Sequence, residues 1–197
     1  YCNPNAEDLT LSGLPRNIGR INAVVNTLAQ YDGRYFTNLL QSFSPLSFGW
    51  LNGYKAMPVI SFCFFIYALY FFTSTLFEIK ATHITELAII AICYFAVIPS
   101  LPHSLYWMSS AFVYLWPFMF MFIAIGSYIR YREYDENRWY ILMLIALALG
   151  IGLNELFIIP FLFFGIVIAL DCYKSKRVIK DALPALALIL FCVYIFV

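Results

Sequence analysis

The chain has 197 residues, of which 63% are hydrophobic, 20% aromatic and only 12% charged, and its formal net charge is +1. Soluble domains carry about 25% charged residues, so this composition excludes a soluble globular domain, a disordered chain and a secreted disulfide scaffold. A net charge this close to zero also argues against a nucleic acid as partner. We therefore predict an all-α, polytopic transmembrane helix bundle whose first partner is the lipid bilayer.

Residues 1–55 are the polar exception and predict an outer loop with two interfacial helices. Apolar residues recur at three- and four-residue steps after Pro15, and again after Asp32, with polar side chains between them. Amphipathic helices of this kind lie in the plane of the membrane interface. We expect both helices to rest on the membrane surface.

Residues 56–197 predict a transmembrane bundle of about six membrane segments. The apolar stretch 139–170 is too long for one ordinary span at 1.5 Å rise per residue and short for two. Its centre holds Asn154 and Glu155, so we predict a short broken helix pair that meets at these residues. The other spans are expected at residues 56–77, 84–98 and 110–129, and from residue 182 onward.

Basic residues predict the topology of these spans. Arginines precede the stretch 139–170 and lysines follow it, and basic loops stay on the cytoplasmic side of a membrane. The stretch must then cross twice, which places its central turn, His103 and the N-terminal region on the outer face. The chain opens without a methionine and ends within an apolar run, so we expect a fragment of a longer chain.

Two charged motifs of the outer loop are candidates for chemistry. Glu7 and Asp8 could act as a general base for an acceptor hydroxyl in a partly hydrated cleft, although a solvated turn or a helix cap is an equally good interpretation of the pair. Arg34 lies at the first turn of a predicted surface helix, where the backbone N–H groups also favour a phosphate. The alternative is that Asp32 caps this helix and the arginines contact lipid headgroups non-specifically.

Glu155 is a candidate because a charged side chain inside an apolar stretch costs roughly 2.5 to 3.5 kcal/mol unless it faces a cavity or a partner. Its alternative role is structural, bonding the broken helix ends beside Asn154. His103, Tyr106 and Trp107 follow a proline break on the outer side. Aromatic faces there could stack on a sugar ring, or could simply anchor the chain at the membrane interface.

Three pieces of the chain carry a resemblance to a known family. They are Glu7-Asp8 with the Tyr-Asp-Gly-Arg-Tyr motif ending at Tyr35, the Leu-Tyr-Trp-Met-Ser-Ser-Ala-Phe-Val-Tyr segment 105–114, and the Gly-Leu-Asn-Glu motif 152–155. Together they resemble an uncharacterised family of bacterial polytopic membrane proteins, which is similar to the C-type (GT-C) polyprenyl-phosphate-dependent glycosyltransferases.

The resemblance implies an enzyme of the bacterial inner (cytoplasmic) membrane that takes a sugar from a lipid-linked donor. Its acceptor would be a cell-envelope glycan or lipid. The first-loop acid of that superfamily would be Glu7 or Asp8, acting as base or as ligand of a divalent metal ion, the only cofactor implied.

These expectations combine into a hypothesis of inverting sugar transfer at the outer boundary of the membrane. Glu7 or Asp8 deprotonates the acceptor, and Glu155 completes the polar cavity. The expected substrate-binding residues are Arg34, Tyr35, His103, Tyr106, Trp107 and Asn154. Two alternatives stay open: a carrier or flippase, suggested by the broken helix pair, and a polymerase of lipid-linked glycans.

Overall fold

The computed structural model describes residues 3–30, 33–77, 84–97, 105–174, 186, 187 and 190. Within this part of the chain the ordered elements are helices and there is no strand, which confirms the predicted all-α class. His103, Asp32 and nearly all of the last expected span lie outside the described residues.

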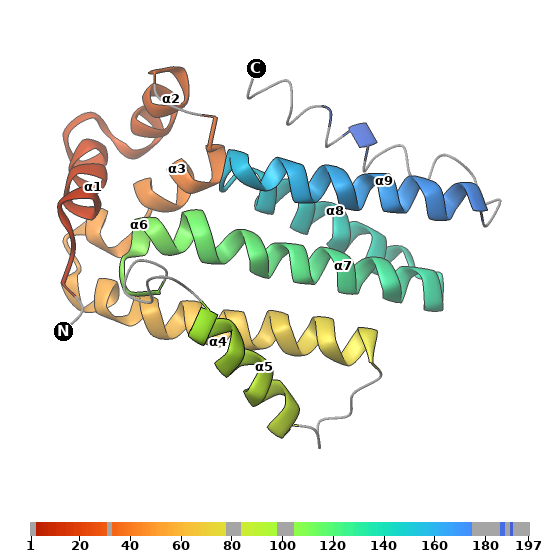
Figure 1. The fold of residues 1–197 in the computed structure, drawn as a ribbon. Helices are drawn as coiled ribbons and strands as arrows, with labels where there is room; N and C mark the ends of the chain where they lie inside the picture. Colours follow the sequence, from red (N-terminus) through yellow and green to blue (C-terminus); the bar gives the residue numbers. More distant parts are fainter. Residues whose placement is uncertain are drawn as a thin grey trace.

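Four helices run lengthwise and form the bundle (Figure 1). They are α4 (Leu51–Leu76), α7 (Trp116–Tyr134), α8 (Asn137–Ile151) and α9 (Ile158–Lys174). Among the described residues, three helical stretches are long and apolar enough to cross a membrane: Leu51–Leu76, Met108–Tyr134 and Glu155–Tyr173, of 26, 27 and 19 residues. Helix α8 is apolar but shorter. These helices could embed in a lipid bilayer.

Helix α4 begins at Leu51, before the start expected at residue 56. The left-handed backbone of Gly49 (φ 76°) ends the preceding short 3-10 helix, η1 (Pro45–Phe48), and α4 follows directly. Lys55 therefore lies in the second turn of α4 with its side chain exposed. A long lysine side chain can keep its charge in water while its methylenes cover apolar surface, so one lysine does not mark the end of a span.

Close contacts between aromatic rings and small residues hold the bundle together. A Cβ on Gly126 of α7 would lie 2.8 Å from the ring of Phe71 on α4, and one on Gly150 of α8 would lie 2.6 Å from Phe161 on α9. Helix α5 (Ile84–Val97) joins α4 through rings, its Tyr94 lying 4.6 Å from Phe65 between ring centroids.

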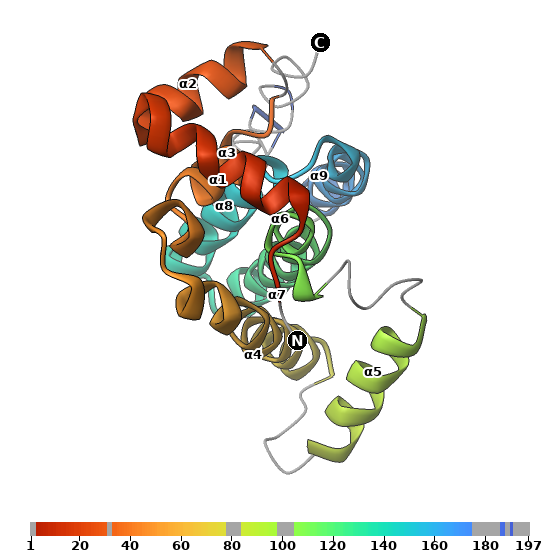
Figure 2. The same cartoon turned by 90° about the vertical axis from the view of Figure 1, so that its left-hand side faces the viewer.

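The N-terminal residues form three helices that lie across one end of the bundle, as Figures 1 and 2 show together. They are α1 (Ala6–Ile18), α2 (Arg20–Gln30) and α3 (Tyr35–Ser42). The first amphipathic stretch, expected as one helix, is divided at Gly19, whose φ of 87° is incompatible with a continuing helix. The apolar face of α2 is exposed, with Ile21 at 72% and Val25 at 59%.

A short irregular segment connects this end to α7. It consists of α6 (Met108–Ser110) and the π-helical turn η3 (Ala111–Leu115). Pro117 lies at the start of α7 and has no N–H to donate to the carbonyl of Val113, four residues earlier. That carbonyl must find a donor elsewhere in the fold.

Candidate functional site

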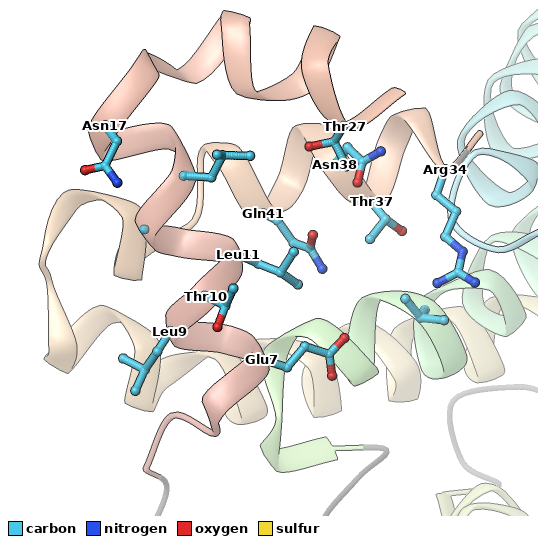
Figure 3. A pocket seen from close by; sticks show the side chains of 13 residues that line it. Glu7, Leu9, Thr10, Leu11, Asn17, Thr27, Arg34, Thr37, Asn38 and Gln41 are labelled. Carbon is cyan, nitrogen blue, oxygen red and sulfur yellow. The ribbon is translucent and has the colours of Figure 1, made fainter. Parts of the chain in front are cut away.

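A pocket of about 510 Å³ opens where α1, α2 and α3 meet η3 (Figure 3). This volume lies within the range of small-molecule sites. Its wall combines leucines and one valine with amide and hydroxyl side chains, and with two charged residues. The lining residues are Glu7, Leu9, Thr10, Leu11, Gly13, Leu14, Asn17, Thr27, Arg34, Thr37, Asn38, Gln41 and Val113.

Glu7 contributes the carboxylate of the pocket. Its side chain is exposed and projects from the first turn of α1 into the space bounded by α3 and η3 (Figure 3). In the described part of the chain, no hydrogen bond or ion pair engages this carboxylate. Glu7 is therefore available to a ligand that enters the pocket.

Asp8, the next residue, has a different environment. It is 1% exposed, and its carboxylate accepts hydrogen bonds from the backbone N–H of Ser109 (2.9 Å) and the hydroxyl of Tyr54 (2.6 Å). It also forms a capping box with Asn5, whose side chain accepts from the Asp8 N–H at 2.6 Å. Asp8 thus ties α1 to α4 and α6. Because successive helical residues point about 100° apart, anchoring Asp8 directs Glu7 toward the pocket.

Arg34, which lines the pocket, contacts Glu155, although 121 positions separate the two residues in the chain. The guanidinium forms a two-pronged ion pair with the carboxylate, Nε donating to Oε2 at 2.5 Å and Nη2 donating to Oε1. The side chains are 29% and 37% exposed. Paired geometry of this kind holds a guanidinium in a defined orientation. It also explains how a carboxylate is tolerated at the end of an apolar helix.

The turn between α8 and α9 brings these two residues together. The ring of Tyr35 covers Gly152 so closely that a Cβ there would lie 2.4 Å from the ring, and the Tyr35 hydroxyl donates to the carbonyl of Ala148. The N–H groups of Phe36 and Thr37 donate to the Gly152 carbonyl at 2.9 and 3.2 Å. The first N–H groups of α3, expected to favour a phosphate, are therefore occupied by this turn.

Asn154 is 1% exposed and does not line the pocket, but it supports a residue that does. Its Nδ2 donates to the carbonyl of Val113 at 2.9 Å, supplying the donor that Pro117 lacks. Its Oδ1 accepts from the N–H of Leu156 at 3.0 Å and caps the short helix η4 (Glu155–Phe157). Asn154 thus joins the broken helix pair to the π-helical turn.

Tyr106 and Trp107 lie near Asp8 in the chain's fold and are not among the lining residues of the pocket. Tyr106 is 42% exposed, and its carbonyl lies 3.5 Å from the hydroxyl of Tyr54. Trp107 is half-buried and precedes α6, where its carbonyl accepts from the N–H of Ala111. His103 lies outside the described residues. In the described part of the chain, no group of three or more His, Cys, Asp or Glu side chains is placed to hold a metal ion.

The neutral polar side chains of α3 that line the pocket were not identified from the sequence. Thr37, Asn38 and Gln41 are all buried, although a surface helix was expected to turn its polar side chains toward water. Their spacing of one, three and four positions does place them on one side of α3. That spacing was the available signal, but nothing local shows that α1 covers this side.

Comparisons of the chain with protein-family models, with curated proteins and with solved structures find no match. The class of this protein is therefore described from its own fold and pocket. It is an all-α bundle with apolar helices able to cross a membrane, and at one end it carries a polar pocket with a carboxylate and an ion-paired guanidinium.

Proposed function

We propose that this protein is a membrane-embedded glycosyltransferase, acting on the outer face of the bacterial inner membrane. It transfers a sugar from a polyprenyl-phosphate donor to a cell-envelope glycan or lipid acceptor. One observation carries the proposal: the unengaged carboxylate of Glu7 and the guanidinium of Arg34 line the same pocket, at the end of helices that could span a bilayer. Such a pocket can receive a donor whose lipid tail stays in the membrane.

The reaction proceeds by inversion at the anomeric carbon of the sugar. The acceptor hydroxyl loses its proton to the Glu7 carboxylate while its oxygen bonds to the anomeric carbon. The bond between that carbon and the phosphate oxygen breaks, and its electron pair leaves with the polyprenyl phosphate. Arg34 stabilises the negative charge that develops on this leaving phosphate. No other reactant is required.

Most of the remaining residues act through these two groups. Glu155 orients Arg34, and Asp8 orients Glu7, so both are positioning residues. Tyr35 and Asn154 hold the turn on which Glu155 lies. His103, Tyr106 and Trp107 remain candidates for contact with the sugar at the outer surface.

The test is sugar transfer by the full chain in lipid nanodiscs, with undecaprenyl-phosphate-linked [14C]glucose or mannose as donor. Acceptors are hexose disaccharides and envelope lipids. Glu7→Gln is expected to lower the rate at least a hundredfold, the usual range for loss of a general base. Glu133→Gln removes an exposed carboxylate at the far end of α7 and should leave the rate unchanged. A Glu7→Gln protein that transfers at the normal rate would refute the proposal.

A carrier or flippase is the second candidate, favoured by the helix break between Ile151 and Ile158. Proteoliposomes containing a fluorescent polyprenyl phosphate distinguish the two functions. A flippase moves the lipid between leaflets without forming a glycosidic product. A glycan polymerase would instead give products of several lengths in the transfer assay.

A further inference from the structure

Gln41 is a buried amide without a hydrogen-bond partner in the described part of the chain. It is 7% exposed, lies in the last turns of α3 and lines the pocket. Figure 3 shows its amide extending from α3 into the space that the Glu7 carboxylate enters from α1. Its amide donor and acceptor are directed to the pocket and are not used within the described part of the chain, so this position favours a polar ligand group.

The chemistry of the surrounding wall restricts what that ligand can be. Thr10 and Thr27 donate their hydroxyl protons to carbonyls one turn back in their own helices, and Thr37 donates to the carbonyl of Leu153. Each of these oxygens keeps lone pairs that can accept a hydrogen bond from a donor. The Gln41 amide supplies both a donor and an acceptor. A ligand hydroxyl, which is also both, complements this wall.

The charge of the pocket wall and its apolar surface also favour a neutral ligand. Arg34 is the only cation among the lining residues of the described pocket, and it lies at the start of α3, about two helical turns from Gln41. The part of the wall around Gln41 therefore offers no attraction to an anionic group. Leucines on α1 provide an apolar surface opposite the amides, suited to the C–H face of a pyranose ring. A neutral ligand with several hydroxyl groups satisfies both sides.

From these features we infer that the pocket binds a neutral, hydroxyl-bearing glycan and that Gln41 is its specificity-determining residue. The role of this glycan as acceptor rests on the proposed function. Hydrogen bonds to the Gln41 amide hold one sugar unit, and a hydroxyl of that unit lies next to the Glu7 carboxylate. The acceptor is then a glycan rather than a lipid.

The test measures binding without the donor, so it does not depend on transfer. Saturation-transfer NMR on the full chain in nanodiscs uses cellobiose, maltose and mannobiose as probes. Gln41→Met keeps the length of the side chain and should weaken the best disaccharide about tenfold. Asn17→Leu, at an exposed lining position on α1, should weaken it at least threefold. Asn52→Leu makes a comparable change at an exposed site on α4 and should have no effect.

Each outcome separates this inference from the proposed function. Disaccharide binding that depends on Gln41 supports the inference even where no transfer is measured, and then it is the transferase proposal that fails. Unchanged affinity in Gln41→Met, with an unchanged thermal transition, overturns the inference. So does a Gln41→Met protein that loses affinity for vesicles containing undecaprenyl phosphate while no disaccharide binds.

Discussion

Replacing Gly152 by alanine tests whether the turn between α8 and α9 holds the site together. An added Cβ would lie 2.4 Å from two ring carbons of Tyr35, whereas non-bonded carbons normally approach to about 3.5 to 4.0 Å. Neither the Tyr35 ring nor the Gly152 backbone can move away easily. The Tyr35 hydroxyl is bonded to the Ala148 carbonyl, and the Gly152 carbonyl accepts from the N–H groups of Phe36 and Thr37.

The expected cost follows from these contacts. Overpacking costs about 1 to 3 kcal/mol, and loss of the Tyr35 hydrogen bond adds about 1 kcal/mol. For a chain of this size, each kcal/mol shifts Tm by roughly 2 to 4 °C, so Gly152→Ala should lower Tm by roughly 4 to 16 °C. The same shift moves Arg34 away from Glu155, and we expect sugar transfer to fall at least tenfold.

Thermal unfolding in detergent, followed by tryptophan fluorescence, measures this effect. Gly13→Ala is the matched control, because a Cβ on Gly13 meets nothing within 4 Å and alanine is the better helix former by up to about 1 kcal/mol. Its Tm should be equal to or above that of the wild type. In the double variant Tyr35→Leu/Gly152→Ala, the two losses should be less than additive, since the first change removes the clash.

A Tm for Gly152→Ala equal to that of the wild type would show that Tyr35 does not pack against this turn. Additive losses in the double variant would lead to the same conclusion. In either case the pairing of Arg34 with Glu155 would need another explanation.

Two further predictions concern the carboxylates that support the pocket. Asp8→Ala leaves the hydroxyl of Tyr54 and the N–H of Ser109 without their buried acceptor, and should cost about 2 to 4 kcal/mol in thermal or denaturant unfolding. Glu155→Gln removes a charge from a partly exposed pair and should cost only about 1 kcal/mol. It should nevertheless raise KM for the polyprenyl-phosphate donor at least fivefold while changing kcat less, since Arg34 loses its orientation.

Glu133→Gln serves as the control for both carboxylates, because it removes an exposed charge far from the pocket. An Asp8→Ala protein as stable as the wild type would contradict the anchoring role of Asp8. A Glu155→Gln protein with an unchanged KM for the donor would show that Glu155 does not position Arg34.

The all-α class and the approximate positions of the long helices follow from local properties of the chain. Apolar runs of about 20 residues satisfy their own backbone hydrogen bonds only as helices in a lipid environment, so hydropathy alone indicates them. The helix break near Asn154 is also visible locally, because two glycines and two polar residues interrupt an apolar run. The start of a helix is harder to predict. Lys55 suggested that α4 begins after it, but a single lysine can lie either before or inside an apolar helix.

The division of roles between Glu7 and Asp8 could not be read from the sequence. The two are adjacent acids in the same turn, and only the position of α4 and α6 decides which one is buried. The same holds for Gln41, whose burial depends on α1 crossing above α3.

The sequence by itself determined a helical protein with segments apolar enough to cross a membrane, and a short set of charged and aromatic candidates, because apolarity and helical spacing are properties of neighbouring residues. Only the tertiary structure decided that Arg34 meets Glu155 and that Glu7 faces a pocket walled by neutral amides and hydroxyls. These contacts join positions far apart in the chain. They depend on how whole helices cross, which is set by the packing of Tyr35 on Gly152 and of Asp8 between α4 and α6.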